Sequence, residues 1–190
     1  MRPVNRTLPA ALAALLLSAC NQAPPAEPAG TVDLSAWASE TIQLPPGFAP
    51  GLPPGLEELR FAPGMYDAGA EDYWSYVYVL RFEESAGGED WLRDVLEQYY
   101  DGLITAVAGS RGLTLEGEPA EVTLRPGEDG KQRADVDLVD AFVTGAPLTI
   151  HMELELVPSD AGTQVRAAVS PQPPDHPVWS DLRAALATLP

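Results

Sequence analysis

Large apolar side chains occupy both faces of one extended segment in the middle of the chain. Residues 73–82 are YWSYVYVLRF, and alternation places on one face Trp74, Tyr76, Tyr78, Leu80 and Phe82. The other face carries Val77 and Val79. A strand with two apolar faces is usually covered on both sides, so we expect a central strand here.

Two segments show the helical spacing of apolar residues. Residues 89–110 begin with acidic residues, end just before Gly112, and carry an apolar stripe of Leu92, Val95, Leu96, Tyr99, Leu103 and Val107. In the C-terminal segment 175–190, we expect Asp175 to be the N-cap, His176 to take part in the cap and Pro177 to lie in the first turn. The stripe of this shorter helix is Val178, Leu182, Ala185, Leu186 and Leu189.

Four further strands are predicted between the two helices, at residues 113–125, 132–143, 148–157 and 163–170. The turn segments PGEDG, TGAP and PSDAG separate them, and such short connections indicate antiparallel neighbours. The order of elements predicts an α+β fold, in which two helices pack on an antiparallel sheet of about five strands in a meander. This topology resembles the PsbP-type fold found in several small lipoproteins.

Proline and glycine dominate the segment 41–67, which is predicted to be a loop. LPPG occurs at 44–47 and again at 52–55. Proline removes backbone donors and glycine permits positive φ, so a helix is excluded. Apolar residues punctuate the segment, namely Phe48, Leu52, Leu56, Leu59, Phe61 and Met65. The loop is therefore expected to lie against the domain, either packed over the core or gripping a ligand.

Aromatic side chains suit either a core or a binding pocket. The candidates are Tyr73, Trp74, Tyr76, Tyr78, Tyr99, Tyr100 and Trp179. If they line a pocket, we expect its wall to be the second face of the strand at 73–82. The resulting hypothesis places a ligand or partner surface at Phe61, Met65, Tyr76 and Tyr78.

Charged residues alternate with apolar ones in two neighbouring predicted strands. Glu153 and Glu155 share the outward face with His151, and Asp135 and Asp137 face outward on the preceding strand. With a turn at 145–146 and a bulge near position 139, the expected neighbours are His151 with Asp140, Glu153 with Asp137, and Glu155 with Asp135. Like charges placed opposite each other are destabilising. Either a cation or Arg166 must therefore offset the repulsion between these carboxylates, or this register is wrong.

A hard-cation site could be built from Asp135, Asp137 and Glu153, because calcium prefers several carboxylate oxygens. However, no spacing matches the EF-hand loop. The alternative is a solvated sheet face with no bound metal.

Signatures of enzymes are nearly absent. The chain has no Gly-x-Ser-x-Gly, Walker or His-Glu-x-x-His motif, it has two histidines, and no cofactor is expected. These features favour a non-enzymatic binding or interaction module. The alternatives are a hydrolase that acts on envelope material through carboxylates and His151, and a cation-binding structural protein.

The N-terminus has the three parts of an export signal. Arg2 and Arg6 supply positive charge, an apolar run follows at 8–17, and small residues precede Cys20. The apolar run is about ten residues long, whereas a membrane-spanning helix needs about 20.

The sequence LSAC at 17–20 resembles a bacterial lipobox. The resemblance implies a diacylglycerol on the Cys20 sulfur, cleavage before this residue, and acylation of the new amino terminus, by palmitate for example. The alternatives are an ordinary cleaved signal and a buried free cysteine. With Asn21 rather than an acidic residue at the second mature position, the resemblance to Gram-negative lipoproteins implies the outer membrane, with the domain facing the periplasm. The expected division is a signal peptide at 1–19, a lipidated cysteine and Pro/Ala-rich tether at 20–36, and a single domain at 37–190.

The chain is strongly acidic, with 11 basic and 28 acidic residues. Loss of Arg2 and Arg6 with the signal leaves 9 basic residues, a net charge of −19. Such a surface repels nucleic acid and anionic headgroups, so nucleic acid is excluded as a partner. The remaining partners are the membrane, through the anchor at Cys20, and an envelope protein or small ligand.

Five stretches together resemble a family of exported bacterial proteins. They are RFAPGMYD (60–67), YWSYVYV (73–79), YYDGL (99–103), FVTGAPLTIHMEL (142–154) and VSPQPPDHPVWSDLR (169–183). The resemblance covers about residues 40 to 185. It implies that the loop at 61–65 and the segment before the last helix belong to one architecture. The resemblance indicates no substrate, so no catalytic residue can be assigned from it.

Overall fold

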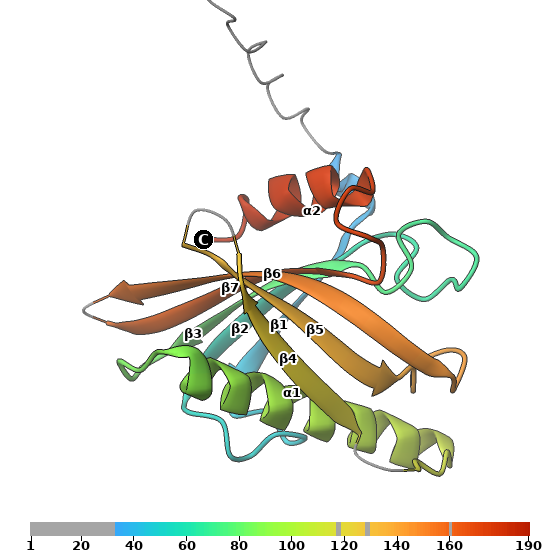
Figure 1. Ribbon diagram of the computed structural model, residues 1–190, viewed down its shortest axis with the longest axis horizontal. Helices are drawn as coiled ribbons and strands as arrows, with labels where there is room; N and C mark the ends of the chain where they lie inside the picture. Colours follow the sequence, from blue (N-terminus) through green and yellow to red (C-terminus); the bar gives the residue numbers. More distant parts are fainter. Residues whose placement is uncertain (1–32, 117–118, 128–129, 160) are drawn as a thin grey trace, which may run out of the picture.

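An open antiparallel sheet with a helix on each face forms the structure (Figure 1). The computed structural model describes residues 33–116, 119–127, 130–159 and 161–190. Seven strands follow the order β1-β2-β3-β7-β6-β5-β4 across the sheet. The elements are a short 3-10 helix η1 (Leu34–Ala36), β1 (Ala38–Leu44), β2 (Gly55–Phe61), β3 (Tyr76–Phe82), α1 (Glu89–Arg111), β4 (Ala120–Pro126), β5 (Gln132–Val139), β6 (Pro147–Ser159), β7 (Gly162–Ser170) and α2 (Val178–Leu186). The α+β class is therefore confirmed.

The sheet has two strands more than the predicted number. Strands β1 and β2 lie inside or beside the proline- and glycine-rich segment that we expected to be a loop. They form a hairpin, and β2 extends the sheet by pairing with β3, from Gly55 opposite Phe82 to Phe61 opposite Tyr76. The loop prediction fails here because the strands occupy the short stretches between the Pro-Gly turns.

The meander predicted after α1 is confirmed as β4 to β7, each antiparallel to the next. Two boundaries differ from the sequence pattern by more than two residues. Strand β4 begins at Ala120 instead of 113, and β5 ends at Val139 instead of 143. The amide of Asp140 donates to the carbonyl of Ala146, and this bond closes the turn into β6.

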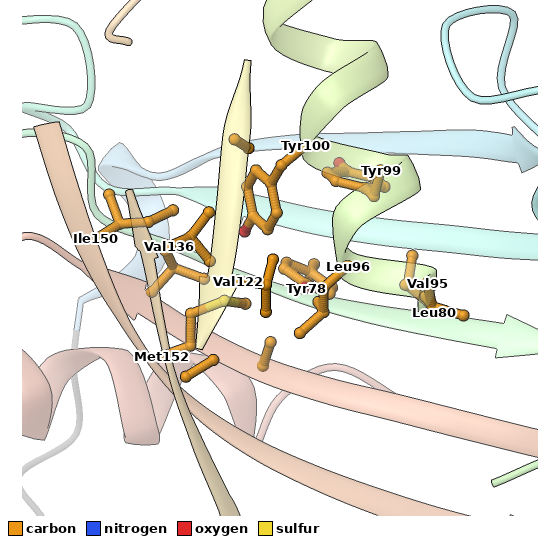
Figure 2. Close-up of a cluster of buried hydrophobic side chains, with 14 of the residues drawn as sticks. Tyr78, Leu80, Val95, Leu96, Tyr99, Tyr100, Val122, Val136, Ile150 and Met152 are labelled. Atoms are coloured by element: carbon orange, nitrogen blue, oxygen red, sulfur yellow. The ribbon is translucent and has the colours of Figure 1, made fainter. Parts of the chain in front are cut away.

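Strand β3 is buried on both faces, as its alternation predicts. Tyr78 and Leu80 pack under α1, where they join residues of β4 to β6 in one large core (Figure 2). Val77 and Val79 belong to a second, smaller cluster under α2, which contributes Trp179. The two helices therefore cover opposite faces of the sheet (Figure 1).

The helix ends agree largely with the sequence signals. Gly112 caps α1 in the left-handed conformation, with φ of 67°. At the start of α2, the ring Nδ1 of His176 accepts a bond from the amide of Val178 at 3.2 Å. This cap uses His176, and the expected N-cap at Asp175 is wrong, because the N-cap residue is Pro177.

Candidate functional site

A cavity of about 170 Å³ opens on the α1 side of the sheet, next to β1 and β2. We name it the aromatic pocket. Seven rings line it: Phe48, Phe61, Tyr66, Trp74, Tyr76, Tyr99 and Phe142. The lining is completed by Glu40, Ile42, Leu59, Met65 and Leu103. The pocket thus collects side chains from β1, β2, β3, α1 and three loops.

Five of these rings contact one another in a closed circuit, which we name the aromatic circuit. The centroid distances are 6.4 Å for Phe61–Tyr66, 6.0 Å for Tyr66–Phe142, 5.4 Å for Phe142–Trp74, 6.3 Å for Trp74–Tyr76 and 6.0 Å for Tyr76–Phe61. These separations are within the range in which aromatic pairs attract. The circuit is therefore a mutually supported wall.

The mouth of the pocket carries an exposed ring and a carboxylate. Tyr66 is 57% exposed. It is the more exposed of two large apolar residues that lie at the surface in the described part of the chain. Burial of part of its ring raises the pKa of the Tyr66 hydroxyl, and the negative charge of Glu40 raises it further. Glu40 is exposed and lines the same pocket as Tyr66.

A single carboxylate fixes the far wall of the pocket. Asp140 is almost fully buried and accepts bonds from Trp74 Nε1 at 2.8 Å and from the Tyr73 hydroxyl. The amides of Phe142 and Val143 donate to the same carboxylate at 3.1 and 3.0 Å. Thr144 adds its amide and its hydroxyl at 2.6 and 2.7 Å.

The charge state of Asp140 follows from these bonds. Burial raises the pKa of the carboxyl, but the bonds from Tyr73, Thr144 and Trp74 together hold it well below its usual range. Trp74 itself has a φ of 51°, a conformation that is costly for a residue with a large side chain. The bond to Asp140 offsets that cost, so this carboxylate positions both Trp74 and the Phe142 loop.

On the α1 side, Tyr99 links the pocket to a buried acid. Its hydroxyl donates to Glu57 Oε1 at 2.8 Å, and its ring stacks on Tyr78 with centroids 5.9 Å apart. Glu57 has no exposed surface, and its Oε2 has no hydrogen-bond partner within the described part of the chain. Burial raises the pKa of Glu57 to about 7, partly opposed by the Tyr99 bond.

The backbone of the 45–54 loop touches α1 at a glycine. A Cβ at Gly102 would lie 2.1 Å from the carbonyl oxygen of Phe48. The glycine in the middle of this helix therefore permits the close approach that brings Phe48 against Tyr99, with ring centroids 5.4 Å apart.

The structure brings together three of the four residues proposed as a ligand surface. Phe61, Met65 and Tyr76 line the pocket, whereas Tyr78 is fully buried and lies outside the lining. The pocket uses the tyrosine face of β3, so our expectation that its wall would be the second face was wrong. On that second face, Trp179 packs in the smaller core.

Sequence reasoning missed Glu40, Tyr66 and Phe142 as pocket residues. Tyr66 lies in a turn of the segment expected to be a loop, and Phe142 was placed in the strand predicted at 132–143 but lies in the turn after β5. Glu40 lies in β1, next to the predicted loop at 41–67. No local pattern marks such positions. The stretches RFAPGMYD and FVTGAPLTIHMEL contain two of them, and those stretches carried the family resemblance.

The acidic sheet face forms ion pairs and hydrogen bonds rather than a cation site. Asp135 accepts from Arg125 at 2.6 Å, Asp137 binds the hydroxyl of Thr149, and Glu153 accepts from Arg183 at 2.7 and 2.9 Å. Among the described residues, no group of three or more His, Cys, Asp or Glu side chains could hold a metal ion. The Arg183 bonds, opposed by burial, lower the pKa of Glu153.

The predicted register of these strands is wrong. His151 lies opposite Asp135, Glu153 opposite Arg133, and Glu155 opposite Arg166. The like-charge pairs that we expected therefore do not form. Asp140 is not a strand residue, because its carboxylate binds the amides of the loop that follows β5.

A second hollow of about 360 Å³ lies on the α2 side, between β4 to β6 and the start of α2. His151 and Asp135 line it with Arg125 and Arg133, and His151 Nδ1 is 2.8 Å from Asp135 Oδ1. Ser170, the residue opposite His151 on β7, is fully buried and its hydroxyl pairs with Ser75 at 2.8 Å. This serine is therefore not presented to the hollow.

Comparison with family models, curated proteins and solved structures gave no match. No helix in the described residues is both long enough and apolar enough to cross a membrane.

Proposed function

We propose that this chain is a lipid-anchored cell-envelope protein whose aromatic pocket binds an apolar group of a small ligand or of an envelope partner. The observation that carries the proposal is the aromatic circuit with its exposed member, Tyr66. Exposed apolar surface beside a preformed cavity is a feature of binding sites more than of a closed core.

The size of the pocket supports one bound group of modest volume. Its 170 Å³ is close to the roughly 150 Å³ of a cavity that holds benzene. One ring or one short branched group would fill it. A larger ligand would have to leave its remaining part at the mouth, beside Tyr66 and Glu40.

The anchor part of the proposal rests on the sequence. Cys20 follows LSA and precedes a Pro/Ala-rich stretch, in a region that lies outside the described residues. Two or three acyl chains hold a protein on a bilayer durably, whereas one does so marginally. Asn21 supports a location on the outer membrane, where the domain faces the periplasm.

The binding proposal is tested with benzyl alcohol as the probe, titrated into the purified full-length protein and followed by two-dimensional NMR. We expect shifts confined to the pocket residues. Removal of one ring by Tyr66→Ala or Phe61→Leu should weaken binding about tenfold. Trp91→Leu, which removes a ring of α1 outside the pocket, is the matched control. Saturable binding that Tyr66→Ala and Phe61→Leu leave unchanged would exclude this pocket.

We propose in addition that the fold is of the PsbP type. The order of strands and helices along the chain supports this, together with the presence of a helix on each face of the sheet. A crystal structure that superposes poorly on PsbP-type domains would contradict it.

A hydrolase is the second candidate function, favoured by the His151–Asp135 pair in the hollow on the α2 side. Asp135 would fix the imidazole through Nδ1, which leaves Nε2 to take a proton from water. We expect slow cleavage of p-nitrophenyl acetate or bis(p-nitrophenyl) phosphate that His151→Gln abolishes. His176→Gln, at the start of α2, is the control. A rate that is equal in both variants and in the wild type would remove this candidate.

A further inference from the structure

We propose that the group bound in the aromatic pocket is an organic cation, namely an ammonium whose substituents are methyl or similar small alkyl groups. This inference rests on the proposed function, because it names the ligand class of the same pocket. Three independent features carry it: the number of rings, the sign of the nearby charge, and the engagement of the polar groups in the wall.

The first feature is the density of aromatic rings. The faces of aromatic rings attract cations within about 6 Å of their centroids. All five members of the aromatic circuit line the same cavity, and neighbouring centroids are 5.4 to 6.4 Å apart. A cation in the pocket therefore contacts several rings at once, and the attraction is strongest where water is excluded.

The second feature is the charge at the mouth. Within the described part of the chain, Glu40 is the one ionisable residue of the lining other than tyrosines. Its negative charge acts on Tyr66 and also on the buried Glu57. No basic side chain is among the described residues that line the pocket. Arg111 of α1 approaches the Phe142 loop, but it donates to the carbonyl oxygens of Ala141 and Val143. An anionic ligand would meet repulsion here, and a cationic one attraction.

The third feature separates an alkylated ammonium from a primary one. The polar atoms of the inner rings already have partners: Trp74 binds Asp140, Tyr76 binds Tyr100, and Tyr99 binds Glu57. A primary ammonium carries three N–H donors. On entering the pocket it would lose their hydrogen bonds to water, and the apolar wall offers no acceptors in exchange. An ammonium that carries methyl groups has few N–H donors or none, so it loses few hydrogen bonds to water when it enters the pocket.

The test compares choline with 3,3-dimethylbutan-1-ol, its neutral analogue of nearly the same shape. The purified full-length protein is kept in a maltoside detergent, which has no ammonium headgroup, and binding is measured by calorimetry or NMR titration. We expect choline to bind about tenfold more tightly than the alcohol. Glu40→Gln should weaken choline binding about threefold to tenfold and leave the alcohol unaffected.

The matched control is Glu121→Gln, which removes the same charge from an exposed position of β4. It should leave both affinities unchanged. Equal affinity for the two probes would overturn the cation proposal while the binding function stands. Choline binding that neither Glu40→Gln nor Tyr66→Ala alters would also overturn it, as would absence of choline binding. The proposed function would then be judged by the benzyl alcohol titration.

Discussion

Trp74 donates a hydrogen bond of 2.8 Å to Asp140, a residue 66 positions later in the chain. Through this bond the turn before β3 and the turn after β5 become one wall of the aromatic pocket. The same carboxylate holds the Phe142 amide at 3.1 Å, so both rings take their positions from Asp140. Asp140 is therefore a positioning residue, and it contributes no surface to the pocket lining.

Replacement of Asp140 by Asn should destabilise the protein strongly. The amide group would present N–H donors to a site that is built from donors, and loss of a buried charged acceptor costs about 3 kcal/mol. Urea unfolding of Asp140→Asn measures the change. Asp137→Asn, on the exposed sheet face, is the control, with an expected change below about 0.5 kcal/mol. Equal stabilities of the two variants would show that the Asp140 bonds contribute little.

The same carboxyl should make the protein sensitive to acid. Because the pKa of Asp140 is lower in the folded protein than the ordinary value of 3.8, its carboxylate stabilises the fold above that value. The stabilisation is lost as the pH falls below it. Melting temperatures should therefore drop more steeply toward pH 2 for the wild type than for Asp140→Asn. Parallel curves would contradict the assigned charge state.

Two glycines of α1 offer a matched test of the loop contact. A Cβ at Gly102 would meet the Phe48 carbonyl, whereas Gly109 has open space around it. We expect Gly102→Ala to destabilise the protein by about 1 to 3 kcal/mol and to loosen Phe48. Gly109→Ala should stabilise it by about 0.5 to 1 kcal/mol, since alanine favours helices. Chemical unfolding of both variants provides the measurement, and two changes of the same sign would contradict the contact.

Much of the fold could be predicted from local patterns. The two apolar faces of β3, the stripe of α1 and the turn signals between β4 and β7 each arise from a residue's immediate neighbours. The hairpin of β1 and β2 could not be predicted in this way. Glu57 occupies an inward position of β2 between Gly55 and Leu59, and a buried acid there disrupts the alternation that marks a strand.

The pocket was harder to predict than the fold. Phe61, Met65 and Tyr76 were expected on one surface because their sequence segments are aromatic and adjacent. Tyr66 and Phe142 reach the same cavity only through tertiary structure: the Asp140 bonds hold the Phe142 loop, and the Tyr66 ring contacts Phe61 and Phe142. The strand register around His151 was also missed, because the Asp140 loop ends β5 earlier than its alternation suggests.

Cys20→Ser should abolish lipid attachment. The serine cannot accept a diacylglycerol through sulfur, so the cleavage and amino-terminal acylation that follow would also fail. Cells labelled with an alkynyl palmitate should give a labelled band for the wild type and none for the variant. The wild-type protein should fractionate with the outer membrane. Equal labelling of the two proteins would contradict anchoring at Cys20.

Glu57 should give the protein an unusual loss of stability toward neutral pH. Its pKa rises from 4.5 to about 7 on folding, so the folded state holds a proton that the unfolded state has released between these values. The free energy of unfolding should therefore decrease as the pH rises from 4.5 to 7, by about 3 kcal/mol from this group.

Glu57→Gln isolates this effect, because the amide keeps an acceptor for the Tyr99 hydroxyl and carries no charge at any pH. Urea unfolding of both proteins at pH 4.5, 6 and 8 should show a gap that favours the variant and widens with pH. Glu121→Gln, which removes a charge from an exposed position of β4, should shift the curve far less. A gap that stays constant across this range would mean that Glu57 does not titrate between the two states. The unpartnered Oε2 would then need another explanation.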